Sequence, residues 1–203
     1  MRTIESTDTI TAIANSSRGT TSGRIAVLQD GGIIRKGSRG RHGGVEWNES
    51  ECVSALLAVV LDHPHGADVA DRIKRIRALP LVYSRSNPLE SRASLEAAIR
   101  GSFKFVAGLS LHPLHTLGKA LDAIVRDMRD GTFNAWTGGA DSDVVCDFHH
   151  EGQSAVLMID QPDRNQSAVF GFGFDRDQPS ATEKFVRIRM AAFTRLAEAM
   201  GPP

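Results

Sequence analysis

The most concentrated run of functional side chains in the sequence is a basic, glycine-rich segment over residues 35–44. Its cations Arg35, Lys36, Arg39 and Arg41 are interleaved with glycines. Each cation can neutralise a phosphate, and glycine lets the backbone bend and approach a phosphate chain closely. The lysine does not sit in a Gly-Lys-Ser/Thr sequence that opens a helix, which excludes a nucleotide-binding P-loop. The segment therefore predicts contact with the backbone of a nucleic acid.

Two short helices are expected before this segment. Asp8 or Thr9 can cap the first, and a turn over residues 17–20 leads to the second, which Thr20 or Thr21 can cap. The pair Gly31-Gly32 ends the second helix in the usual left-handed manner.

This pair of helices matches part of the helix-turn-helix pattern. Gly19 takes the place of the turn glycine, and the apolar residues Ile25 and Leu28 follow at the spacing that turns them inward. The outward residues of the second helix would then read base edges, with Arg24 addressing guanine and Gln29 adenine, although a Gln29 that is merely solvated is an equal alternative. The expected base-reading residues are Thr21, Ser22, Arg24 and Gln29.

The basic loop is followed by a strand-like segment and by the start of another helix. Val45-Glu46-Trp47 is strand-like, and Asn48-Glu49-Ser50-Glu51 forms a capping box that starts another helix. Over residues 5–79 this order resembles the MerR-type winged-helix DNA-binding domain. The resemblance implies a winged helix-turn-helix that docks on DNA, of the kind that compact prophage-encoded regulators and packaging proteins use. The family's Arg-Tyr-Tyr and long dimerisation helix are not evident, so its mechanism of activation by DNA distortion is not implied.

The rest of the chain predicts an α+β protein in three parts. Residues 1–80 would be the winged helix-turn-helix, 81–140 a helical middle, and 141–203 a small antiparallel sheet of three strands packed with a long helix. The strands are expected at Val144–His149, Ala155–Ile159 and Ala168–Phe174, and the helix after the cap Ser180-Ala-Thr-Glu183.

Charge is distributed unevenly along a chain whose formal net charge is zero. Residues 15–45 hold six basic residues against one acidic residue, Asp30, whereas residues 141–203 hold ten acids and six bases. A local basic patch on a neutral chain is consistent with nucleic-acid binding, and chance clustering on a solvated loop is the plainer alternative.

Other classes of protein have little support in the 203 residues. No apolar run approaches the ~18 residues of a membrane span, and the N-terminus has no signal-peptide pattern, so we expect a cytoplasmic protein. The two cysteines, Cys52 and Cys146, are expected to be free thiols, although one disulfide is possible. Six of the seven histidines occur as three pairs without ligand spacing, so no metal, cofactor or catalytic motif is expected. The pairs are His63/His65, His112/His115 and His149/His150.

The sequence therefore predicts a non-enzymatic, sequence-specific double-stranded DNA-binding protein that acts in transcriptional control. We expect a homodimer formed through residues 141–203, because the shared face of Phe170, Phe172 and Phe174 and the helix from Phe185 to Met200 offer more apolar surface than a three-stranded sheet needs. The competing interpretation is that these phenylalanines pack against the helical middle. Two other functions remain open: an accessory subunit for DNA packaging or recombination in a phage or mobile element, and a protein that binds a phosphorylated metabolite.

Overall fold

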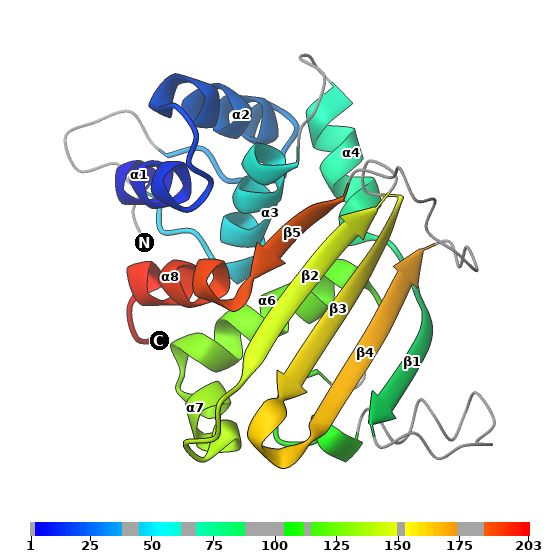
Figure 1. The fold of residues 1–203 in the computed structure, drawn as a ribbon. Helices are drawn as coiled ribbons and strands as arrows, with labels where there is room; N and C mark the ends of the chain where they lie inside the picture. The colour runs from blue at the N-terminus through cyan, green and yellow to red at the C-terminus, as the bar shows by residue number, and fades with distance from the viewer. Residues whose placement is uncertain are drawn as a thin grey trace.

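The computed structural model describes residues 3–37, 45–61, 68–87, 104–111, 115–149, 153–173 and 185–203. Helices gather on one side of an antiparallel sheet, so the expected mixed α+β class is confirmed (Figure 1). None of the helices in these ranges is long and apolar enough to cross a membrane. The helices are α1 (Thr3–Ile13), α2 (Arg18–Asp30), α3 (Glu49–Val60), α4 (Asp68–Arg77), α6 (Leu117–Arg129), α7 (Thr132–Thr137) and α8 (Met190–Met200), with a short 3-10 turn η2 (Pro162–Arg164). The strands are β1 (Leu81–Asn87), β2 (Asp143–His149), β3 (Ser154–Gln161), β4 (Gln166–Gly173) and β5 (Val186–Arg189).

The sheet has five strands in the order β1-β4-β3-β2-β5, and every neighbouring pair is antiparallel. Alternate residues of each strand point to the core, as the strict alternation of half-buried and buried positions along β3 illustrates. Leu157 of β3 lies opposite Cys146 of β2 on one side and Phe170 of β4 on the other, and all three are buried. The three strands expected from the sequence, β2, β3 and β4, form the centre of this sheet.

The sheet is larger than the three strands expected, because an edge strand is added on each side. The expected helical middle begins with β1, which pairs with β4. The expected long helix begins only at Met190, because Val186–Arg189 forms β5 and pairs with β2. Val186 and Ile188 alternate with two arginines, a pattern that is typical of a strand. The strand was not predicted because the helical pattern of the residues that follow was extended back over it. The proposed cap at residues 180–183 lies outside the described residues.

Helices α6 and α8 pack against each other beneath the sheet, where Figure 1 shows α6 crossing behind β2 and β3. Leu121 of α6 and Phe193 of α8 are fully buried there. Both cysteines are buried free thiols, and burial raises the pKa of the Cys52 thiol to about 12. These thiols are packing groups, with too little thiolate to react at neutral pH.

The phenylalanines that suggested a dimer interface belong to the core. Phe170 and Phe172 are 3% and 2% exposed, and the apolar face of α8 is buried as well. Phe174 lies outside the described residues. The dimer prediction therefore loses the surface on which it was based, because this surface is covered by the protein's own helices.

Gly171 of β4 leaves room for a close neighbour. It lies opposite Tyr83 of β1, and a Cβ atom built on it would overlap the Tyr83 ring. The Tyr83 ring therefore occupies the space that a side chain at position 171 would fill.

Polar contacts join the N-terminal helices to α6. The guanidinium of Arg77 donates from Nη2 to Asp122 Oδ2 of α6 at 2.6 Å and to Ser50 Oγ of α3 at 2.8 Å. Arg129 of α6 donates to Glu49 Oε1 at 2.8 Å. The first turn of α3 is therefore tied to α4 and to the helix beneath the sheet.

Candidate nucleic-acid interface

Helices α1 and α2 follow one another with a short turn between them, and their boundaries differ from those expected. Helix α1 begins at Thr3, before the caps proposed at Asp8 and Thr9. The Ser17 hydroxyl accepts a hydrogen bond from the Thr20 amide at 3.1 Å, so α2 starts at Arg18. Gly19 consequently lies inside the first turn of α2, and Asn15 is the turn residue with a left-handed backbone, at φ 48°.

The inner face of α2 includes one residue that we expected to face DNA. Thr21, Ile25 and Leu28 are all buried, and Thr21 has 0% of its surface exposed. These positions are four and three residues apart, so they fall on one side of the helix. The expectation that Thr21 reads bases is therefore wrong: its side chain is part of the packing between the N-terminal helices.

The outer face of α2 is exposed and built from small residues. Ser22, Gly23 and Ala26 are all exposed, and a Cβ at Gly23 would have nothing within 4 Å. A glycine in a helix interior costs about 1 kcal/mol relative to alanine, and no neighbouring atom accounts for it here. This face is smooth enough for another molecule's backbone to approach closely.

The other two expected base-reading residues are only half-buried and not extended. Arg24 has its Nη1 atom buried. Gln29 Nε2 donates to the carbonyl oxygen of Arg35 at 3.4 Å. Both side chains would have to rearrange before they could enter a DNA groove, so their base-reading roles stay predictions.

The basic loop is closed at its base by Arg35. Its Nη2 donates to the Glu46 carbonyl at 2.6 Å and to Glu51 Oε2 at 2.7 Å, while its Nε and backbone amide both donate to Glu51 Oε1. Arg35 and Glu46 therefore lie side by side, between the end of α2 and the start of α3. In place of the expected strand at residues 45–47, Glu46 forms an isolated bridge and Trp47 is buried.

Glu51 is the centre of this arrangement. It accepts from the Asn48 amide at 2.9 Å, and Asn48 Oδ1 accepts from the Glu51 amide at 3.0 Å, which completes the expected capping box. Burial alone would raise the pKa of Glu51, but the hydrogen bonds from Arg35 and Asn48 outweigh it, so its pKa lies below the ordinary value. Glu51 is therefore ionised at neutral pH and holds the loop and the helix start together.

The expected phosphate-binding cations fall into three groups. Arg35 is committed to Glu51, so its first role is to close the loop, which corrects the expectation of a free phosphate ligand. Lys36 is exposed and pairs with the exposed Asp30 at 2.7 Å, a contact weak enough to exchange for a phosphate. Arg39 and Arg41 lie outside the described residues.

The sequence interpretation missed two features of this interface. Glu51 was recognised only as a capping residue, because nothing in the spacing indicates that a cation sixteen positions away would share it. Gly23 was overlooked, although an exposed glycine inside a predicted helix is a signal of close approach.

Among residues that the structure describes, no three His, Cys, Asp or Glu side chains gather in a way that could hold a metal ion. Cys146 and His149 belong to opposite faces of β2, since Cys146 points into the core.

No protein family, curated protein or solved structure matches this chain.

Proposed function

We propose that this protein is a non-enzymatic transcriptional regulator that binds double-stranded DNA through α2 and the basic loop that follows it. The observation that carries the proposal is the closed loop base, in which Arg35 bridges Glu46 and Glu51. In this proposal the Gly/Arg-rich segment acts as a wing beside α2. A wing of this kind lets its cations meet one phosphate strand while the helix approaches the neighbouring groove.

Two further features support this assignment. The smooth outer face at Ser22, Gly23 and Ala26 lets α2 approach a duplex without a steric barrier. Residues 15–45 hold six basic residues against one acidic residue in a chain with zero net charge, so attraction to a polyanion is local to this region. Phosphate contacts by the wing would set the position, and the polar group on Ser22 would contribute to reading sequence.

The experiment is a salt titration of binding to a labelled pool of random duplexes, followed by fluorescence anisotropy. We expect the double variant Arg39→Ala/Arg41→Ala to weaken binding to all duplexes. The slope of log affinity against log salt should fall by about two units, roughly one for each lost phosphate contact.

The matched control removes two exposed cations from α6, in the variant Lys119→Ala/Arg126→Ala. It should bind with the parent's affinity and slope. Sequence preference is tested separately by selecting bound fragments with the parent and with Ser22→Ala, which should select a less restricted set. If the loop variant and the α6 variant bind alike, the wing assignment is wrong.

A further inference from the structure

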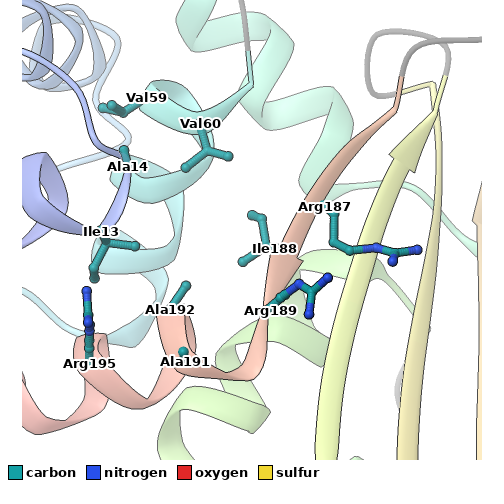
Figure 2. A pocket seen from close by; sticks show the side chains of 10 residues that line it. All are labelled: Ile13, Ala14, Val59, Val60, Arg187, Ile188, Arg189, Ala191, Ala192 and Arg195. Carbon is teal, nitrogen blue, oxygen red and sulfur yellow. The ribbon is translucent and has the colours of Figure 1, made fainter.

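A cavity of about 430 Å³ opens where the N-terminal helices meet the sheet. Its walls come from the ends of α1 and α3 on one side and from β5 and the start of α8 on the other. Figure 2 shows Ile13, Val60, Ile188 and Ala192 around the hollow. The volume falls in the range of roughly 300–1,000 Å³ that small-molecule sites occupy.

The charged side chains among the described lining residues are all positive. Three arginines contribute to the lining, and none of the described lining residues is acidic. Arg187 is neutralised, because its Nε and Nη2 both donate to Asp147 at 2.7 Å. Arg189 and Arg195 are exposed and form no ion pair with any residue in the described ranges.

Of the three arginines, Arg195 is the one positioned to bind a ligand in the cavity. In Figure 2 its side chain stands beside Ile13, whereas Arg187 and Arg189 extend from β5 toward the outer face of the sheet. The cavity therefore combines apolar side chains with an unpaired guanidinium at one side. A ligand that fits must bring both an apolar body and a negative charge.

We propose that this cavity binds a small amphipathic carboxylate, with the carboxylate on Arg195 and the apolar part against Ile13, Val60 and Ile188. A guanidinium is a strong partner for a carboxylate, and the apolar walls favour removal of the ligand's hydrocarbon from water. The site lies between α1 and β5 of the sheet, and this proposal does not rest on the proposed DNA binding.

The probe is octanoate, titrated into the full chain while the methyl signals of isoleucine and valine are followed by NMR. We expect saturable shifts at Ile13, Val60 and Ile188. The cationic octylammonium ion, of the same length, should bind at least about tenfold more weakly, because it meets Arg195 with the wrong charge.

Two variants localise the site. Arg195→Gln should weaken octanoate binding about tenfold, the ratio that corresponds to one charge-assisted hydrogen bond. Ala192→Leu should fill the hollow and weaken octanoate and octylammonium alike. Arg75→Gln, which removes an exposed arginine from α4, is the matched control and should bind octanoate as the parent does.

Three results would overturn the proposal. The first is equal affinity for octanoate and octylammonium, which would make the cavity a nonselective hollow. The second is an unchanged affinity for octanoate in Arg195→Gln. The third is a set of shifts confined to methyl groups away from this cavity.

Discussion

At the scale of single residues, Glu51 has the most contacts that matter for the candidate interface. It receives hydrogen bonds from the Arg35 side chain, the Arg35 amide and the Asn48 amide. Only 6% of its side chain is exposed, whereas 57% of the Arg35 side chain is exposed. The buried Glu51 carboxylate is therefore held in place by the fold, and its hydrogen bonds orient the exposed Arg35 guanidinium.

The first prediction concerns the substitution Glu51→Gln. Glutamine keeps the size but loses the charge, so at pH 7 we expect the free energy of unfolding to fall by about 2 kcal/mol, a typical value for hydrogen bonds to a charged group. Because the folded pKa of Glu51 is lowered, its ionised form stabilises the fold above its unfolded pKa, and this contribution is lost as pH falls through the folded pKa.

Urea denaturation at pH 7 and at a series of lower pH values measures this effect. The difference between parent and Glu51→Gln should shrink as the solution is acidified. Glu46→Gln is the control, because it makes the same change on an exposed side chain at the loop base. A pH-independent difference would mean that the charge of Glu51 does not matter.

Local sequence patterns predicted the cap of α3 correctly, but they did not predict which distant residues contact each other in this interface. The capping box of Asn48 and Glu51 followed from a local pattern, and it is present. Thr21 was misplaced although its spacing from Ile25 and Leu28 is helical, because a polar residue was assumed to face water. The pairing of Arg35 with Glu51 depends on how the chain folds back, and no local pattern contains that information.

At the scale of elements, α2 combines a tightly packed inner face with an outer face made of small residues. Gly31, at its C-terminal end, allows close packing on α4, because a Cβ there would meet the Cβ of Ala70 at 2.5 Å. Gly23 has no such neighbour. The two glycines therefore have different reasons to be present, one inside the protein and one at its surface.

A second prediction separates stability from binding at Gly23. The Gly23→Ala variant should be more stable by roughly 1 kcal/mol, since alanine favours the helix and its methyl group meets no atom. It should also bind duplex DNA several-fold more weakly, because the methyl group enters the surface that approaches the duplex. Thermal unfolding and anisotropy measure the two effects. A variant that gains stability and keeps its affinity would remove the outer face of α2 from the interface.

The edge strand β1 provides a third prediction. Gly171→Ala should lower the free energy of unfolding by about 1–2 kcal/mol, because the new methyl group overlaps the Tyr83 ring and forces it aside. In a Tyr83→Ala background the same substitution should cost much less. A double-mutant cycle by urea denaturation gives the coupling energy. Additive effects would show that Tyr83 does not occupy the space over Gly171.

The elements that the sequence predicted are those with long, regular patterns. Helix α3 and the central strands β2, β3 and β4 all lie close to their expected positions. The edge strands were missed for physical reasons. β1 carries Ser84, Arg85 and Ser86 and resembles a polar loop, and β5 has only four residues that run directly into a helix. Their strand conformation comes from pairing with β4 and β2.

At the scale of the whole molecule, a single apolar cluster runs from Ile10 in α1 to Met200 in α8. The first turn of α3 connects the parts through polar contacts as well, since Glu49 and Ser50 bind arginines that also contact other elements. The expected division at residues 80 and 140 follows composition, whereas the core is shared across both positions. We therefore expect the candidate interface and the sheet to unfold together.

The last prediction uses the two tryptophans, which report on opposite ends of the molecule. Trp47 is buried beside α3, and Trp136 of α7 donates from Nε1 to the Phe105 carbonyl at 3.2 Å. Trp136→Phe leaves only Trp47 as a fluorescent reporter, and Trp47→Phe leaves only Trp136.

If one core holds the molecule together, the fluorescence of each variant should change at the same urea concentration as its own far-ultraviolet circular dichroism. That comparison within a variant removes the effect of the substitution on stability. A shared transition would also explain how a ligand at the junction of α1, α3, β5 and α8 could influence α2, because neither part could loosen alone. If Trp47 reports a transition clearly below the one seen by circular dichroism, the N-terminal helices form an independent module, and the division at residue 80 is a real domain boundary.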